Sequence, residues 1–435
     1  MKFLFAFIVL VSSYGLTLAQ TAADPAITEF DVNGMKVIVK RRTSSPTIAG
    51  GLFIRGGVQG QTAANSGIEG LTLDAAVEGS KKFPRASLRQ ELARTGSAIG
   101  AAASNDYSVI SFASTSGNLA GTWALLSDLV LEPTFINDDV ERVRQAHLSA
   151  LRDASSSPDS ALALLEEKIV AAGHPYSNPA RGTIDAVTKF TPQQLAAYYK
   201  DLMVTSRLVL VIVGDVDLAE IKRLAVASFG SLPKGSYKAT PLPHLAFDKS
   251  TLDISSRPVP TNYVKGVFAA PAMADPDYYA MRVAMTILQS RVYEEVRIKR
   301  NLSYAPNAEM GDLSANSGNI YVTAVDANES VRVMLAVIAD LKTNLVDEDD
   351  FSRLPGYFLT THYIEEETNA AQARELAQYE LIGGGWRRSL GFVDGIKSVT
   401  REQVRDAANK YIKNIRFVVI GDPTKIDKSV FSAVP

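Results

Sequence analysis

The feature that most constrains the fold of this chain is an internal repeat. Thr191 precedes an amphipathic segment that leads into an apolar run ending in Gly-Asp at 214–215, and Thr400 precedes a similar segment ending in Gly-Asp at 421–422. Threonine is favoured at the start of a helix, and a short apolar run is typical of a buried strand. The two threonines are 209 residues apart and the two glycines 207. Such regular spacing predicts two homologous halves of about 200 residues each.

The elements expected in the first half are a mixture of strands and helices. Residues 29–40 alternate apolar and polar side chains around Asn33-Gly34, the preferred pair for a tight hairpin turn. Further strands are expected at 47–54 and 107–114, with a helix at 88–95 between them. This order indicates a mixed α and β domain whose first elements, at 29–40, are strands of the sheet.

The N-terminus carries the pattern of an export signal. Lys2, an apolar run and small residues predict a signal peptide at 1–19, removed from the mature protein. The two halves are expected to join across a stretch with proline and glycine at 232–247. Residues 236–248 are the expected linker between an N-terminal domain, 20–235, and a C-terminal domain, 249–435. No later segment approaches the roughly 18 apolar residues of a transmembrane helix, so we expect no membrane span. A signal peptide on a chain that contains no cysteine favours a periplasmic or secreted location for the protein.

Composition and motif searches exclude several classes of function. The chain has no cysteine, which excludes disulfides, thiolate zinc sites and cysteine nucleophiles. Its formal charge of −2 gives no electrostatic basis for binding nucleic acid. The compact motifs for serine hydrolases, dinucleotides, phosphate loops and zincins are absent. No two of the four histidines are close enough in sequence to form a helical ligand pair.

Several segments together resemble one family. The Asn-Gly hairpin, Arg55-Gly-Gly, the stretch at 66–80 and the two Gly-Asp strand ends are similar to the insulinase/pitrilysin family of zinc peptidases. The similarity is greatest to its two-domain, half-length branch, which includes mitochondrial processing peptidases and bacterial heterodimeric peptidases. The resemblance implies an α+β fold of two homologous α/β-roll domains. Each would be a mainly antiparallel sheet packed against helices, and a pseudo-twofold would relate them.

The family's zinc motif is degenerate in this sequence. In the family, a helix carries His-x-x-Glu-His, whose histidines bind zinc and whose glutamate is the general base, and a later helix supplies a glutamate as third ligand. The matching positions here are Gly70, Leu73 and Asp74, with Leu148 seven residues after Glu141. A hydrolytic zinc site needs three protein ligands, so we expect this chain to bind no metal. Asp74 is most simply a surface or helix-stabilising residue.

The second half keeps more of the family pattern. Residues 291–304 resemble a second-domain segment in which an arginine and a tyrosine, seven residues apart, face the zinc site across a closed chamber. Arg297 and Tyr304 have this spacing. The resemblance implies that the tyrosine donates to the scissile carbonyl or its oxyanion and that the arginine binds a backbone carbonyl. Without the resemblance, Arg297 would be one basic residue at a helix end and Tyr304 a core aromatic.

These observations lead to one function and to alternatives from other classes. The chain is expected to be the zinc-free subunit of an exported heterodimeric zinc metallopeptidase, with no peptidase activity alone. Its partner would be a homologous His-x-x-Glu-His subunit that holds the zinc, and its substrate a peptide or unfolded polypeptide. Arg297 and Tyr304 would complete the catalytic chamber. The alternatives are an inert architectural subunit of a larger assembly and a homodimeric peptide-binding protein.

Overall fold

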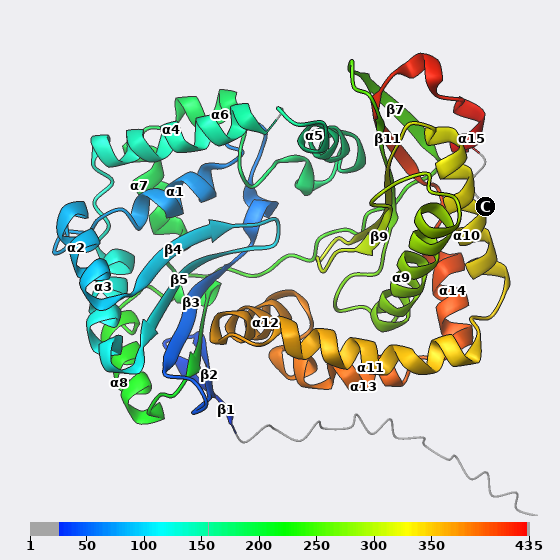
Figure 1. The fold of residues 1–435 in the computed structure, drawn as a ribbon. Helices are drawn as coiled ribbons and strands as arrows, with labels where there is room; N and C mark the ends of the chain where they lie inside the picture. Colours follow the sequence, from blue (N-terminus) through cyan, green and yellow to red (C-terminus); the bar gives the residue numbers. More distant parts are fainter. Residues whose placement is uncertain (1–25, 155, 433–435) are drawn as a thin grey trace, which may run out of the picture.

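The computed structural model describes residues 26–154 and 156–432, which form two domains (Figure 1). The expected signal peptide, residues 1–19, lies outside the described residues. Within the described part of the chain, none of the helices combines the length and the apolar character needed to cross a membrane.

The N-terminal domain contains a six-stranded sheet in the order β1-β2-β6-β3-β5-β4. Its strands are β1 (Ile27–Val32), β2 (Met35–Arg41), β3 (Thr47–Arg55), β4 (Ala98–Ala103), β5 (Tyr107–Thr115) and β6 (Leu208–Gly214). Neighbouring strands are antiparallel except for β2 and β6. Asn33 and Gly34 both have positive φ, 54° and 90°, as a type I′ turn requires, so the predicted hairpin is confirmed.

The C-terminal sheet repeats this topology with five strands in the order β7-β11-β8-β10-β9. The strands are β7 (Thr251–Ser256), β8 (Asn262–Ala269), β9 (Asn307–Met310), β10 (Ser317–Ala324) and β11 (Arg416–Gly421). β7 and β11 are parallel, and the other pairs are antiparallel. This order matches β2-β6-β3-β5-β4 strand for strand, so β1 is an addition to the N-terminal copy.

The helices follow the same correspondence. The N-terminal domain has α1 (Ile68–Ala76), α2 (Arg85–Thr95), α3 (Leu119–Leu131), α4 (Asn137–Asp153), α5 (Pro158–Val170), α6 (Ile184–Lys189), α7 (Pro192–Leu202) and α8 (Leu218–Phe229). The C-terminal domain has α9 (Tyr278–Val292), α10 (Ala327–Thr343), α11 (Glu348–Glu365), α12 (Asn369–Ile382), α13 (Phe392–Lys397), α14 (Arg401–Tyr411) and α15 (Lys428–Ser432). In chain order, α1 corresponds to α9, α4 to α11, α5 to α12 and α7 to α14. The predicted α+β fold of two related domains is confirmed.

The helices that carry the repeated threonines begin in the same way. Thr191 accepts a hydrogen bond from the backbone of Gln194, whose side chain accepts one from the Thr191 backbone. Thr400 and Gln403 form the same capping box at the start of α14. Each box satisfies two backbone donors that a helix start leaves open.

Each domain covers part of the other domain's sheet with one of its own helices. In Figure 1, α12 of the C-terminal domain lies against the strands of the N-terminal sheet, and α5 of the N-terminal domain lies beside β11. Buried side chains from both domains meet under α12, namely Ile27, Ile38, Phe53, Val209, Val211, Val213, Ala373, Leu376, Ala377 and Trp386. Under α5 the shared cluster contains Ala161, Leu162, Val418 and Ile420. The two domains therefore share apolar cores, and each lacks part of its cover without the other.

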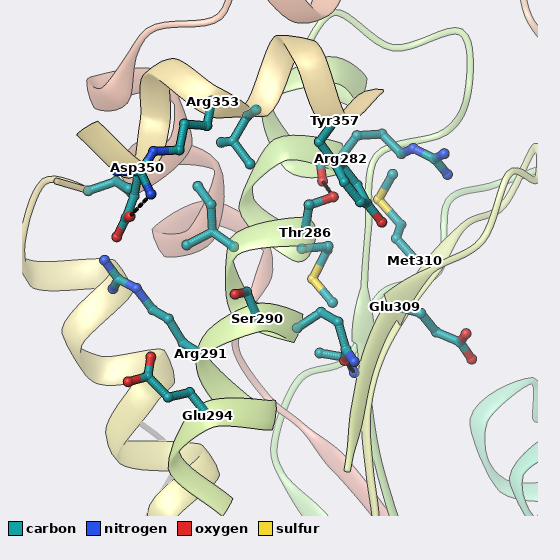
Figure 2. A pocket seen from close by; sticks show the side chains of 16 residues that line it. Arg282, Thr286, Ser290, Arg291, Glu294, Glu309, Met310, Asp350, Arg353 and Tyr357 are labelled. Carbon is teal, nitrogen blue, oxygen red and sulfur yellow. Dashed lines mark hydrogen bonds and ion pairs between the residues drawn. The ribbon is translucent and has the colours of Figure 1, made fainter. Parts of the chain in front are cut away.

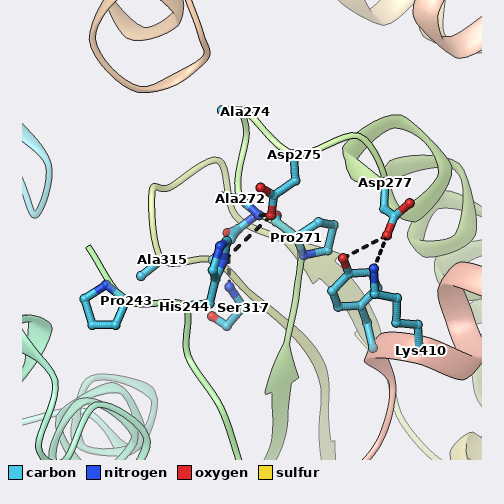
Figure 3. Close-up of polar contacts among 12 residues, drawn as sticks. Pro243, His244, Pro271, Ala272, Ala274, Asp275, Asp277, Ala315, Ser317 and Lys410 are labelled. Atoms are coloured by element: carbon cyan, nitrogen blue, oxygen red, sulfur yellow. Dashed lines mark hydrogen bonds and ion pairs between the residues drawn. The ribbon is translucent and has the colours of Figure 1, made fainter. Parts of the chain in front are cut away.

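The segment between α8 and β7 is packed against both domains. The Arg207 guanidinium lies 4.8 Å from the centre of the Tyr237 ring, and Gln59 donates to the backbone carbonyl of Thr240 at 2.5 Å. Further along, His244 Nδ1 lies 3.7 Å from Asp275 Oδ2 of the C-terminal domain (Figure 3). Phe247 is buried against side chains of both domains. This segment is therefore held in place rather than simply bridging two units.

Candidate functional site

Helix α1 carries the degenerate motif, and a buried carboxylate on this helix joins it to β5 and α7. Glu69 is fully buried, and it accepts hydrogen bonds from Ser108 Oγ of β5 at 2.5 Å and Tyr198 Oη of α7 at 2.9 Å. Arg207 Nη2 lies 3.8 Å from the same carboxylate. Burial raises the pKa of Glu69, and the hydrogen bonds and Arg207 oppose that rise. These contacts set the orientation of α1 on the sheet.

The three motif positions on α1 have different surroundings. Leu73 is fully buried in the apolar core of the domain. A Cβ atom at Gly70 would lie 3.2 Å from the Ala180 carbonyl oxygen and 3.9 Å from His147 Cε1. Asp74 Oδ2 lies 2.7 Å from His147 Nε2, so α1 and α4 are joined by a polar contact at this point.

On α4, the structure directs two neighbouring residues to different places. Leu148, the position matched to the third ligand, is 4% exposed and belongs to the apolar core. His147, one residue earlier, faces α1 and contacts Asp74. Adjacent residues on a helix point about 100° apart, so a shift of one residue separates a core side chain from one that faces a neighbouring helix.

These residues do not fit a hydrolytic zinc site. Asp74 and His147 supply two donor side chains, whereas such a site takes three from the protein. Across the described ranges, no three His, Asp or Glu side chains are grouped so that they could hold a metal ion. Asp74 instead acts as the polar partner of His147, which adds a contact between helices to its expected surface role.

The other three histidines lie apart, and each makes local contacts. His174 Nδ1 accepts a hydrogen bond from the Tyr176 backbone at the start of a short 3₁₀ helix. His244 approaches Asp275, as described above. The His362 ring stacks on Phe392 with ring centres 5.3 Å apart. These contacts give structural roles to all three side chains.

In the C-terminal domain, the structure brings Arg297 and Tyr304 together. Arg297 lies in a π-helical turn, Tyr293–Lys299, that extends α9, a widened geometry that occurs frequently at functional sites. Its guanidinium lies 4.5 Å from the centre of the Tyr304 ring and donates to Asn301 Oδ1 at 3.2 Å. Tyr304 is 78% exposed, so it is not a core aromatic. The pair offers a guanidinium fork and a phenol hydroxyl to solvent at one place.

A family model described as insulinase (peptidase family M16) matches residues 36–184, and one described as the peptidase M16 inactive domain matches residues 189–354. The chain belongs to the insulinase family. The resemblance inferred from the hairpin, the motif stretch and the strand ends is thereby confirmed.

Among curated sequences, this insulinase-family chain is similar to both zinc proteases and complex subunits. It is 26% identical over 306 residues to an uncharacterized zinc protease of Mycobacterium leprae, covering 66% of this chain and 67% of that one. It is 26% identical over 261 residues to the mitochondrial-processing peptidase subunit beta of Blastocladiella emersonii, covering 59% and 55%. It is 23% identical over 272 residues to the bovine cytochrome b-c1 complex subunit 1, covering 62% and 56%. The alignments thus span just over half to two thirds of these relatives.

Solved structures share the fold over nearly the whole chain. A peptidase M16 inactive domain from Pseudomonas fluorescens matches with a TM-score of 0.83 at 21% identity, covering 91% of this chain and 98% of that one. The first half of the periplasmic protease PqqL from Escherichia coli matches with a TM-score of 0.77 at 14% identity, covering 94% and 95%. At these identities the likeness establishes the architecture.

Proposed function

We propose that this chain is the zinc-free subunit of an exported heterodimeric zinc metallopeptidase, paired with a homologous subunit that carries an intact His-x-x-Glu-His motif. One observation carries the proposal. The described part of α1 and α4 lacks the ligand set, while the half-buried Arg297 and the exposed Tyr304 are held side by side. The signal-peptide pattern at residues 1–19 supports a periplasmic or secreted location.

In this pairing, the chain's own residues bind the peptide and stabilise charge. The Arg297 guanidinium donates to a backbone carbonyl of a peptide or unfolded polypeptide, and its planar fork remains charged throughout. The Tyr304 hydroxyl donates to the scissile carbonyl oxygen as negative charge develops there. The partner's zinc supplies the activated water. Asn301 and the tyrosine ring restrict the motion of Arg297, so the donor is placed before substrate arrives.

The test is to co-express the mature chain with a homologous chain from the same genome that carries the intact motif. Cleavage of a quenched fluorescent peptide library is then measured for each chain alone and for the pair. We expect activity in the pair only, and a loss of about ten- to a thousandfold in kcat when Tyr304→Phe removes the hydroxyl. Tyr293→Phe is the matched control, because Tyr293 is an exposed tyrosine eleven residues earlier, at the start of the π-helical turn.

An architectural role is the second candidate, and one observation favours it. One sequence relative is subunit 1 of the cytochrome b-c1 complex, a component of a larger assembly by its name. If the pair cleaves peptides equally well with Tyr304→Phe, or if the zinc-bearing chain is fully active alone, the architectural role replaces the catalytic one.

A further inference from the structure

The pseudo-twofold places a pocket in the C-terminal domain at the counterpart of the degenerate motif. In the N-terminal domain, α1, β4 and α4 surround the motif, and Asp74 and His147 join the two helices. The corresponding elements, α9, β9 and α11, instead enclose a cavity of about 570 Å³ (Figure 2). This volume is within the usual range for small-molecule sites.

The floor of the cavity is apolar and adaptable. It is formed by side chains from all three elements and by Val346, which lies two residues before α11. Its members are Met285, Ile287, Ala308, Met310, Val346 and Leu354, with Tyr357 as an aromatic wall. Met285, Ala308 and Val346 are buried in the main apolar core of the domain. Methionine is unbranched and polarisable, so two of them allow the floor to accept apolar groups of different shape.

Three arginines line the cavity beside three carboxylates, those of Glu294, Glu309 and Asp350, and the arginines differ in how firmly they are paired (Figure 2). Arg282 lies 3.0 Å from Asp312 and Arg291 lies 2.7 Å from Asp340, so both are engaged. Arg353 lies 3.9 Å from Asp350, beyond hydrogen-bond distance, and its side chain is 75% exposed. Its guanidinium is therefore the group best placed to bind an incoming carboxylate in a fork-like contact.

We propose that this cavity binds an apolar carboxylate, with the apolar body on the methionine floor and the carboxylate on Arg353. Two sources have this chemistry, an aliphatic acid such as a fatty acid and the free C-terminus of a peptide ending in an apolar residue. The proposal does not depend on a zinc-bearing partner, because every residue in it belongs to the C-terminal domain of this chain.

The test is calorimetric titration of the mature chain with decanoate and with decylamine, which share a tail and differ in head-group charge. We expect saturable 1:1 binding of decanoate and at least tenfold weaker binding of decylamine. Arg353→Gln should weaken decanoate at least tenfold. Ser290→Phe should abolish binding, since Ser290 lines the cavity from the exposed face of α9 and a ring would fill it. Arg332→Gln on α10, outside the cavity, is the matched control and should change affinity less than twofold.

A second titration distinguishes the sources, using an acetylated peptide ending in leucine with a free or an amidated C-terminus. Binding of decanoate alone identifies an aliphatic acid as the ligand, and binding of the free-acid peptide but not its amide identifies a peptide C-terminus. Equal affinities for decanoate and decylamine, binding that survives Ser290→Phe, or no binding of either acid would overturn the proposal.

Discussion

His147 Nε2 lies 2.7 Å from Asp74 Oδ2, and this contact joins α4 to α1 at the helix pair that carries the degenerate motif. Both side chains are partly exposed, 18% and 38%, so the pair contributes about 1 kcal/mol or less to stability. Its importance is geometric. It shows that the side chain on α4 in contact with Asp74 is a histidine, a residue type that can bind zinc.

The first prediction is that two substitutions create a zinc site. Gly70→His together with Asp74→His places two imidazoles at i and i+4 on one face of α1, opposite His147. Three imidazoles provide the protein ligands of a tetrahedral zinc site. We expect about one zinc per chain to remain after dialysis, measured by elemental mass spectrometry, and none in the parent chain.

Removing His147 separates this prediction from adventitious binding. His147→Ala in the double variant should abolish zinc retention, whereas His174→Ala, which alters a histidine elsewhere in the domain, should leave it intact. Zinc that persists without His147 would show that α4 does not supply the third ligand.

A second prediction concerns the interface under α12. Trp386 is 1% exposed, packs with side chains of the N-terminal sheet and donates to Glu29 Oε2 at 2.6 Å. Trp386→Ala should lower the free energy of unfolding by about 3–5 kcal/mol, as for other large buried aromatics. The chain has two tryptophans, so the variant retains Trp123, which is buried in the N-terminal core, as its single fluorescent reporter.

Urea titration followed by Trp123 fluorescence provides the measurement. Because the domains share apolar cores, we expect the substitution in the C-terminal half to lower the unfolding midpoint reported from the N-terminal half. An unchanged Trp123 midpoint would mean that the two domains unfold independently.

Features of the fold determined by local interactions could be predicted from the sequence. Asn33-Gly34 specifies its turn because both residues tolerate positive φ. Thr191 and Thr400 specify helix starts because their side chains accept a hydrogen bond from the backbone three residues later. The internal repeat predicts two domains for the same reason, because each copy contains these local signals. Membership of the insulinase family followed from segments that keep their order along the chain.

Features that depend on contacts between distant elements could not be predicted in this way. The segments that form α5 and α12 show apolar faces, but nothing in their sequence says that each covers the other domain's sheet. The rotation of α4 about its own axis could not be predicted from the sequence either. Counting seven residues from Glu141 reached Leu148, whereas the residue that faces Asp74 is His147. The cavity beside α9 depends on the distance between two helices, which no spacing in the sequence encodes.

The last prediction concerns pH and a pair of carboxyl groups at the α11–α12 junction. Burial, followed by the adjacent Glu366 carboxyl, raises the pKa of Glu375 to about 8, and Lys40 opposes the rise. A carboxyl with a raised pKa binds its proton more tightly in the folded state. Its stabilising contribution is therefore complete below the unfolded pKa, near 4.5, and is lost as the pH rises to about 8.

Glu375→Gln removes this titration because an amide cannot ionise. Between pH 5 and 8, we expect the parent chain to lose about 1–3 kcal/mol of unfolding free energy relative to the variant, measured by urea unfolding at several pH values. Taking the difference between the two proteins cancels titrating groups remote from Glu375. Glu366, whose carboxyl raises the pKa of Glu375, and His362, whose Nδ1 lies 4.0 Å from Glu375 Oε1, are coupled to the substituted group and remain in the difference. Glu402→Gln, which changes an exposed carboxyl, serves as the control. A parent chain and a Glu375→Gln variant with parallel pH profiles would show that Glu375 is ionised at neutral pH in the folded protein.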